Sequence, residues 1–319
     1  MDIVVVGDIN VDLIFTGLPS LPAYKELKHA KNVKLTMGGS SSIFACNIAR
    51  LGAATAFIGK VGKDHLGDFL IDTLNSAGVD ASRIVRASGM PTGICVSMSF
   101  PQDYAMVSYP GIRESFQLKE IDLDYVEQAR HLHLSGFYLQ PGLQPDCAEL
   151  FRRAKSAGLT TSLDPDHDAR ETWNGGIKEL LAYVDFFLPN ETEALRIARS
   201  ADLVGAMSFF GQSGRTTVVK QGASGVSVLR GRDLFSAPAF HIDPVDTTGA
   251  GDSFNAGFIF QQLQGAPLQQ CMTWGNACGA LSTRALGGID AFPTASEVEA
   301  FLTQRTAGSG KMLNQPVSR

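Results

Sequence analysis

A short glycine-rich segment near residue 250 has the residue types needed to handle a phosphate group. Residues 246–252 read Asp-Thr-Thr-Gly-Ala-Gly-Asp, and an apolar, helix-like run begins at Phe254. Small side chains at Gly249, Ala250 and Gly251 let an anion approach the backbone, where the first amides of a helix lack internal partners. The helix dipole adds partial positive charge at the same end. The segment therefore predicts an anion hole for a phosphate in transfer.

Asp252 ends this turn, and its carboxylate would face both the phosphate and an incoming hydroxyl group. In that position it could accept the proton of the hydroxyl as the attack proceeds. The alternative is a helix N-cap, a position where aspartate is common. The four residues Gly-Ala-Gly-Asp do not separate these interpretations, whereas the complete run of seven residues favours the catalytic one.

The elements that must position this segment alternate between strands and helices. Short apolar runs recur along the chain at residues 3–6, 56–58, 131–135, 160–163, 184–188, 217–219 and 226–229. Helix-period stretches lie between them, for example at 43–51 and 65–77, each followed by a glycine. Buried strands that alternate with helices predict a mostly parallel sheet with helices on both faces.

Two stretches, at residues 12–37 and 90–110, are typical of short antiparallel strands. In the second stretch Ile94, Val96 and Met98 alternate with small or polar residues. This period of two suits a small, half-exposed sheet. Such a sheet could close over a site as a lid, or it could pair with its copy in a homodimer.

The composition excludes several classes of function. The 319 residues include 27 Lys and Arg against 32 Asp and Glu, and no basic run occurs, which argues against nucleic-acid binding. No apolar run approaches the length of a membrane span, and the N-terminus lacks the features of a signal peptide. The five cysteines contain no C-x-x-C pair. We therefore expect a cytoplasmic protein with reduced thiols.

Several segments together resemble the ribokinase-like (PfkB) carbohydrate kinase family. They occur in family order at residues 7–12, 38–39, 47–52, 189–193, 220–225 and 246–252. The small and polar residues at 306–319 predict a disordered tail. The resemblance implies a three-layer α/β/α domain over residues 1–305 with a small β-sheet lid. It also implies an ATP-dependent transfer of the γ-phosphate to a hydroxyl of a sugar or sugar acid, with Mg²⁺.

The resemblance assigns roles by matching position. Asp252 is the expected base, and the amides of Gly249, Ala250, Gly251 and Asp252 form the anion hole. The expected substrate-binding residues are Asn10, Asp12, Gly38 and Gly39, and the expected nucleotide-binding residues are Asn190, Lys220, Gly222, Gly225 and Asn276. Glu193 is expected to hold Mg²⁺ through water, and carbonyls of Asp246 and Thr248 match part of a site for a monovalent cation such as K⁺.

Simpler interpretations stay open for some of these residues. Asn190 and Glu193 also fit a capping box at a helix start. Asp12 could cap a turn, Lys220 could be a solvated strand end, and Asn276 could lie on a helix surface.

The substrate is the least defined part of the prediction. Many relatives have an asparagine where this chain has Ile43, so one hydrogen bond to the substrate is missing or comes from elsewhere. The missing asparagine at position 43 and the apolar lid residues Phe15, Ile94 and Tyr109 leave room for a nucleobase, which makes a nucleoside kinase the alternative within the family. A relative without catalytic activity is the third alternative, although Asp252 and both glycines are intact.

Two further patterns resemble metal sites and fail on their spacing. Residues 164–168 begin like a calcium loop, but the sixth position is Ala169 and the twelfth is Gly175. His131 and His133 share a strand face, but no third ligand lies near them in the sequence.

Overall fold

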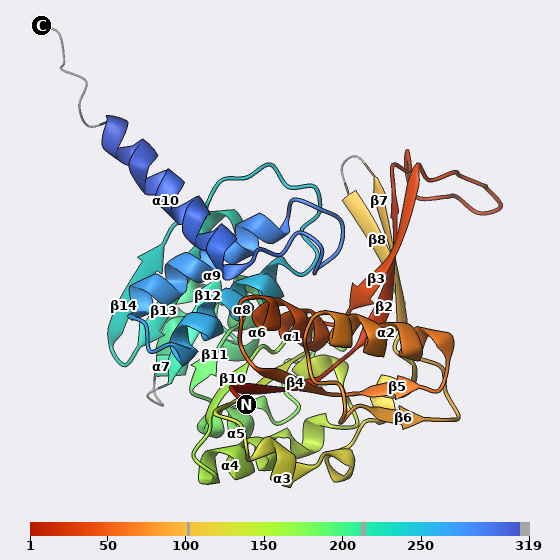
Figure 1. The fold of residues 1–319 in the computed structure, drawn as a ribbon, viewed down its shortest axis with the longest axis horizontal. Coiled ribbons are helices and arrows are strands. Elements are labelled where there is room, and N and C mark those ends of the chain that lie inside the picture. The colour runs from red at the N-terminus through yellow and green to blue at the C-terminus, as the bar shows by residue number, and fades with distance from the viewer. Residues whose placement is uncertain (101–102, 212–214, 313–319) are drawn as a thin grey trace, which may run out of the picture.

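The computed structural model describes residues 1–100, 103–211 and 215–312, and a large twisted sheet forms its centre (Figure 1). The eight strands of this sheet follow one another in the order β14 (Asp233–Ala237), β13 (Val226–Arg230), β12 (Thr216–Lys220), β11 (Phe186–Phe187), β10 (Thr160–Leu163), β9 (His131–Ser135), β1 (Ile3–Gly7) and β4 (Thr55–Ile58). From β12 to β4 all neighbours are parallel, and β13 and β14 add an antiparallel edge.

Helices cover both faces of the sheet, as the sequence predicts. On one side lie α1 (Ser40–Arg50), α2 (His65–Ser76), α8 (Ala250–Leu263), α9 (Leu268–Ser282) and α10 (Ala295–Met312). On the other lie α3 (Leu123–Val126), α4 (Cys147–Ser156), α5 (Ile177–Leu180), α6 (Glu191–Ala198) and α7 (Leu203–Gly211). The central strand β1 shows why its sequence is continuously apolar, because Ile3 and Val5 enter the first core and Val4 and Val6 the second.

Two helices on the first of these faces, α1 and α2, begin and end where local chemistry requires. Helix α2 begins after Asp64, whose carboxylate accepts the Gly67 N–H at 2.8 Å. Helices α1 and α2 are followed by Gly52 and Gly78, which have φ values of 109° and 80°. A positive φ strains any residue with a side chain, so glycine is the residue that lets the chain turn away there.

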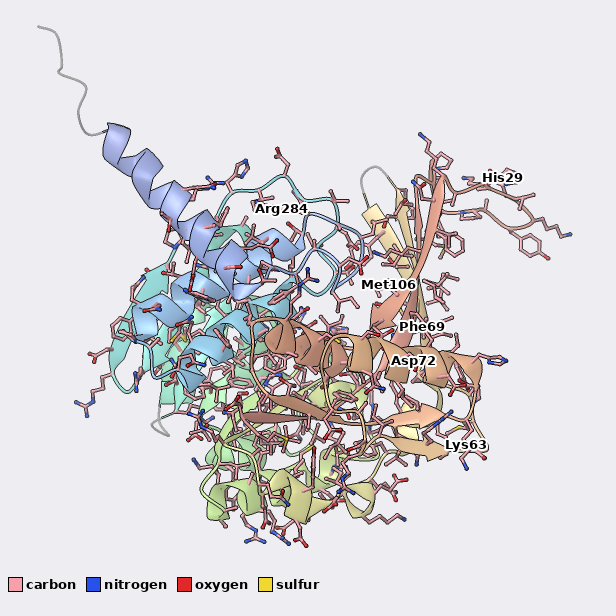
Figure 2. The ribbon with its side chains drawn as sticks, in the orientation of Figure 1. His29, Lys63, Phe69, Asp72, Met106 and Arg284 are labelled. Carbon is pink, nitrogen blue, oxygen red and sulfur yellow. The ribbon has the colours of Figure 1, made fainter. Side chains whose placement is uncertain are left out.

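A second sheet stands apart from the core, and we call it the lid. Its strands are ordered β3 (Asn32–Gly38), β2 (Asn10–Thr16), β7 (Ile94–Phe100) and β8 (Asp103–Tyr109). The pairs β2–β3 and β7–β8 are antiparallel as predicted, but the central pair β2–β7 is parallel. Figure 2 shows Met106 on the lid and His29 on the loop that projects beyond it. A short parallel pair, β5 (Lys60–Gly62) and β6 (Val85–Ala87), completes the strands.

The C-terminal helix extends further than the sequence predicts. Helix α10 continues to Met312, so residues 306–312 of the expected disordered tail are helical, and 313–319 lie outside the described residues. No helix in the described part of the chain combines the length and the apolar character needed to cross a membrane.

Candidate active site

The carboxyl ends of the parallel strands bring together residues that are far apart in the sequence. Asp8 follows β1, Asp164 follows β10, and Lys220 ends β12. Strand β1 lies between β4 and β9, so the chain winds outward in opposite directions on either side of it. In open α/β sheets, ligands bind outside the carboxyl ends of strands at such a switch point. This edge is therefore the place to look for a site.

The predicted anion hole lies at the N-terminus of α8. Gly249 precedes the helix with φ of 72°, and no side chain caps the first turn. The Ala250 N–H donates to the Thr247 carbonyl at 3.1 Å, so this amide serves the turn itself. The Gly251 and Asp252 amides belong to the first turn, where α-helical geometry provides no carbonyl partner. These two amides are the donors best placed for an anion.

Asp252 is buried in the first turn of α8, with 9% of its surface exposed. Burial raises the pKa of its carboxyl well above the usual range, and the nearby carboxylates of Asp164 and Asp166 raise it further. The positive charge of Lys220 lowers the pKa of Asp252. A raised pKa makes the ionised form of this carboxyl a stronger base toward a hydroxyl group.

Lys220 is the cation at the centre of these carboxylates. Its Nζ lies 2.5 Å from Asp164 Oδ2 and 3.3 Å from Asn255 Oδ1, and Asn255 Nδ2 donates to the same Asp164 oxygen at 2.5 Å. A Cβ atom added at Gly251 would lie 3.5 Å from Lys220 Nζ, which places the ammonium group beside the anion hole. Lys220 is therefore a buried ion-pair partner and not the solvated strand end that was the alternative.

A cavity of about 360 Å³ extends from the α8 N-terminus along α9. Lys220, Gly222, Gly225 and Asn276 all line it, together with Thr247, Ala250 and Gly251 from the glycine-rich segment. Gly225 must be glycine, because its φ is 96° and a Cβ there would lie 2.1 Å from the Ala237 carbonyl oxygen. Asn276 is buried and its Nδ2 donates to the carbonyls of Ala237 and Pro238 at 3.2 and 2.9 Å. Four of the five predicted nucleotide-binding residues thus share one cavity.

Asn190, the fifth, is not among the residues that line this cavity. It caps α6 instead: its Oδ1 accepts the Glu193 N–H at 2.9 Å, and the Glu193 carboxylate accepts the Asn190 N–H at 2.8 Å. The capping-box alternative therefore describes the observed contacts. Burial and the Asp164 carboxylate raise the pKa of Glu193 to about 8.

The predicted substrate-binding residues meet where the lid joins the core. Asn10 Nδ2 donates to Asp12 Oδ1 at 2.7 Å, and both side chains are buried. Gly38 pairs with Asn10 across the lid, and a Cβ there would lie 2.0 Å from Asp12 Oδ1. A Cβ at Gly39 would lie 2.9 Å from the Asp8 carbonyl oxygen. The glycine pair thus leaves room for the Asp12 carboxylate and for the backbone behind it.

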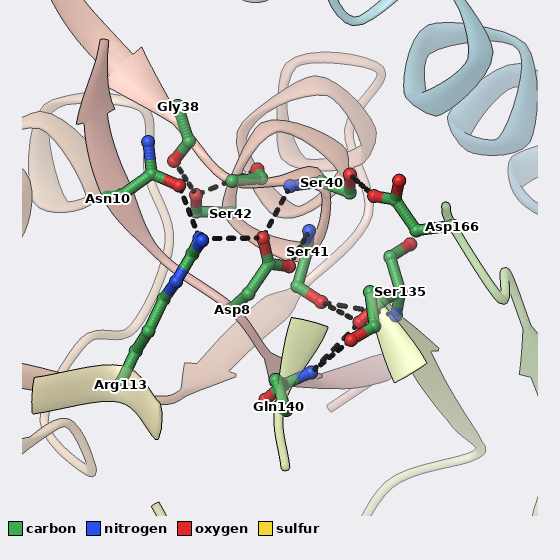
Figure 3. Close-up of polar contacts among 12 residues, drawn as sticks. Asp8, Asn10, Gly38, Ser40, Ser41, Ser42, Arg113, Ser135, Gln140 and Asp166 are labelled. Carbon is green, nitrogen blue, oxygen red and sulfur yellow. Dashed lines mark hydrogen bonds and ion pairs between the residues drawn. The ribbon is translucent and has the colours of Figure 1, made fainter. Parts of the chain in front are cut away.

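Sequence reasoning missed a second set of residues in this network (Figure 3). Arg113 Nη1 donates to Asn10 Oδ1 at 2.6 Å and lies 3.5 Å from Asp8 Oδ2. Asp8 accepts the Ser40 and Ser41 N–H groups at the start of α1, at 3.1 and 2.9 Å. Ser40 Oγ in turn donates to Asp166 at 2.5 Å.

Asp164 and Asp166 belong to the segment that resembles a calcium loop. Within the described residues no group of three or more carboxylates, histidines or cysteines is arranged to hold a metal ion. The two aspartates are instead part of this site, and their place directly after a buried strand is the signal that could have found them.

Ile43, which departs from the family pattern, lies against the glycine-rich loops. It is buried, its Cγ2 would lie 3.2 Å from a Cβ at Gly249, and its Cδ1 would lie 2.6 Å from one at Gly288. One turn later, Asn47 Nδ2 donates to Ser253 Oγ and to the Gly288 carbonyl, each at 3.1 Å. Helix α1 therefore packs directly behind the predicted anion hole.

The loop before α8 is held by the side chain of Asp246. Its Oδ1 accepts the N–H and the hydroxyl of Thr248, at 3.0 and 2.8 Å, and its Oδ2 accepts the Gly287 N–H at 2.8 Å. These bonds fix the backbone on both sides of the carbonyls that were expected near a monovalent cation.

The lid residues taken to leave room for a base lie on the lid face opposite Asp12. Asp12 and Phe15 are three positions apart on β2, so they point to opposite faces of the lid. Ile94 pairs with Val11, and Tyr109 pairs with Ile94, which places both on the face of Phe15. These three side chains therefore do not lie on the Asp12 face of the lid, and the sequence argument for a nucleoside substrate is left with Ile43 alone.

Comparison with known sequences decides the family. A sequence model of the pfkB family carbohydrate kinases matches residues 1–295. The chain belongs to this family. Like other PfkB carbohydrate kinases, it is a phosphotransferase that acts on an alcohol group, and its small sheet and three-layer core have the ribokinase fold.

Individual relatives act on different sugars. The chain is 29% identical to the 2-dehydro-3-deoxygluconokinase of Bacillus subtilis, over 90% of this chain and 93% of that protein. It is 33% identical to the ATP-dependent ribose-1-phosphate kinase of Halopiger xanaduensis, over 94% and 97%. A crystal structure of a putative ribokinase II from E. coli, in complex with ATP and Mg²⁺, superimposes with a TM-score of 0.83 at 22% identity, over 95% and 99%.

Proposed function

We propose that this PfkB kinase transfers the γ-phosphate of ATP to a hydroxyl of a sugar or sugar acid, with Asp252 as the general base. The observation that carries the proposal is the position of Asp252. It is buried at the N-terminus of α8, beside Lys220 and next to a cavity lined by the predicted nucleotide-binding residues. A base, free amide donors and a cation then surround one point, which is what in-line phosphoryl transfer requires.

The nucleotide would occupy the cavity along α9 with its phosphates directed at Gly251 and Asp252. Phe240, Ile242 and Ala280 give this cavity an apolar lining suited to a purine ring, and Asn276 lies among them. The Gly251 and Asp252 amides and the dipole of α8 would stabilise negative charge on the transferred phosphate. The E. coli structure determined with ATP and Mg²⁺ supports this assignment through its shared fold.

The acceptor would bind under the lid, on Asn10, Asp12 and the glycine pair. An ionised carboxylate accepts hydrogen bonds only, so Asp12 suits the hydroxyl groups of a sugar. Asp252 takes the proton of the attacking hydroxyl as the bond to phosphorus forms. Water excluded by the lid would strengthen every electrostatic contact in the site.

The site is chemically suited to Mg²⁺. The carboxylates of Asp164, Asp166, Asp252 and Glu193 lie close enough to affect one another's pKa, and Lys220 is the cation among them. When bound with ATP, Mg²⁺ supplies charge neutralisation at the phosphate oxygens, and it commonly keeps waters and few protein ligands. Glu193 would contact it through water, and Asn190 would hold Glu193 in place through the capping box.

Two finer features of the assembly are part of the proposal. The carbonyls of Asp246 and Thr248 would bind K⁺, since the side chain of Asp246 fixes this loop. The outer face of the lid would meet a second copy of the chain. Leu35 and Val107 lie on that apolar face and are 46% and 64% exposed. Turnover with and without K⁺, and sedimentation of wild type beside Leu35→Glu, test these two points.

A panel of acceptors tests the proposed function. ADP release from Mg·ATP is measured with 2-keto-3-deoxygluconate, ribose, fructose and nucleosides. The proposal predicts saturable turnover with a sugar or sugar acid. Turnover with nucleosides alone would refute the substrate class, and ATP binding without turnover on any acceptor would refute the assigned reaction.

A further inference from the structure

We propose that Arg113 is a positioning residue that orients Asn10 and Asp12 for substrate binding. The inference rests on the proposed function, because it concerns how the acceptor site is held. Arg113 lies in the 3-10 helix η1 (Gly111–Ser115), which follows β8 where the chain leaves the lid. Asn10 begins β2, where the chain enters the lid. Arg113 therefore joins the two ends of the lid across 103 residues of sequence (Figure 3).

The contacts of Arg113 determine how the Asn10 amide is turned. A guanidinium group has donors only, so the oxygen of Asn10 must face it, and Nη1 donates to Asn10 Oδ1 at 2.6 Å. The amide nitrogen then points the other way and donates to Asp12 Oδ1 at 2.7 Å. One oxygen of Asp12 is thereby held, and the orientation of its carboxylate depends on Arg113 through Asn10.

Arg113 also lies beside the carboxylate of Asp8, which accepts hydrogen bonds from the first amides of α1. Its Nη1 is 3.5 Å from Asp8 Oδ2, and Asp8 accepts the Ser40 and Ser41 amides. The glycine pair ends directly before Ser40, so the guanidinium group adjoins both walls of the acceptor site. The two walls are the Asn10–Asp12 pair on the lid and the α1 N-terminus on the core.

The buried guanidinium group of Arg113 is incompletely paired, which does not favour stability. The side chain is 8% exposed, its ion pair with Asp8 is long, and Nε is buried without a hydrogen-bond partner among the described residues. Burying an incompletely paired charge costs free energy, and apolar residues of similar volume often stabilise such a position more. Retaining a guanidinium group here suggests a role in orienting its neighbours.

Electrostatics gives this role a measurable signature. Burial raises the pKa of Asp12 to about 6, whereas the hydrogen bond from Asn10 and the charge of Arg113 act to lower it. The other groups that face Asp12 are the carboxylates of Asp8 and Asp246, which raise its pKa, and the thiol of Cys95 on the neighbouring strand. Without Arg113 the pKa of Asp12 rises further, so the carboxylate that accepts substrate hydroxyls forms only at higher pH.

The test compares Arg113→Met and Arg113→Lys with wild type, using the sugar identified by wild-type turnover. The KM values for sugar and ATP and the kcat are measured from pH 5.5 to pH 9. We expect the sugar KM of Arg113→Met at pH 7 to rise about tenfold or more, as for loss of a charge-assisted hydrogen bond. The loss of sugar affinity at low pH should begin at a higher pH in Arg113→Met than in wild type. The KM for ATP and the kcat should stay within about threefold of wild type. Arg113→Lys should restore part of the affinity.

Lys60→Met is the matched control. Lys60 is another buried cation near η1, paired with Glu120 at 2.7 Å and 3.4 Å from the Ser115 carbonyl, with no bond to Asn10 or Asp12. This variant should keep the wild-type sugar KM and its pH dependence. If Arg113→Met leaves the pH dependence unchanged, or if Lys60→Met shifts it equally, the positioning role is refuted. Because wild-type turnover establishes the proposed function separately, neither result bears on it.

Discussion

The ion pair between Lys220 and Asp164 supports both the fold and the reaction, and removing it should affect each in a measurable way. Their side chains are 12% and 7% exposed, and Nζ lies 2.5 Å from Asp164 Oδ2. Breaking a buried pair by removing one partner leaves an unpaired charge and costs about 3–5 kcal/mol. Asp164 keeps the hydrogen bond from Asn255, so we expect Lys220→Met to lose about 3 kcal/mol of unfolding free energy.

The same substitution should shift the acid–base behaviour of the site. Burial raises the pKa of Asp252, as do the carboxylates of Asp164, Asp166 and Asp8, whereas the charge of Lys220 lowers it. Without Lys220 the pKa of Asp252 rises further, so the acidic limb of the kcat profile should move to higher pH. Lys220 also lines the cavity, so the KM for ATP should rise as well.

Urea unfolding of a double-mutant cycle measures the pair directly. Wild type, Lys220→Met, Asp164→Asn and the double variant are compared at pH 7. Since the double variant lacks both members of this pair, its loss should be smaller than the sum of the two single losses by about 2 kcal/mol. Additive losses, or a loss below about 1 kcal/mol for Lys220→Met, would contradict this reasoning.

Two further predictions concern buried groups. His131 and His133 form a hydrogen-bonded row with Ser162 between them, and burial lowers the pKa of His131 to about 3 and that of His133 well below its usual value. Both histidines gain protons on unfolding below about pH 6.5, so stability is complete above that pH and falls as the pH drops. His131 alone should cost about 3 kcal/mol between pH 7 and pH 4, and a variant with glutamine at both positions should show a flatter dependence in urea unfolding. Gly38→Ala would place a Cβ 2.0 Å from Asp12 Oδ1, so the sugar KM should rise about tenfold or more while the ATP KM stays constant. An unchanged sugar KM would contradict the assigned substrate contact.

Local patterns predicted most of the elements and one side of the site. The alternation of apolar runs with helix-period stretches follows from strands buried on both faces, and the first strand shows this pattern directly. The glycine-rich segment was readable because an anion hole at a helix start is formed by consecutive residues. Gly249, Gly251 and Asp252 could be assigned to the anion hole once a helix start was predicted at this point.

Residues that act through tertiary contacts could not be predicted in this way. Asp8 and Asp164 each follow a buried strand, which points to the carboxyl edge of the sheet, but sequence spacing contains no information on the strand order that sets their neighbours there. Arg113 is a single arginine outside any motif of the sequence, and its partner Asn10 is 103 residues away. The place of Phe15 was predictable, since the period of two in a strand puts it opposite Asp12.

Asp252→Asn tests the central claim most directly. The substitution keeps the size and burial of the side chain but removes its ability to accept a proton. Measured with the sugar identified for wild type, kcat should fall by about 10²–10⁴-fold, while ATP binding by calorimetry and the urea midpoint stay near wild type. Turnover within about threefold of wild type would show that Asp252 is not the base.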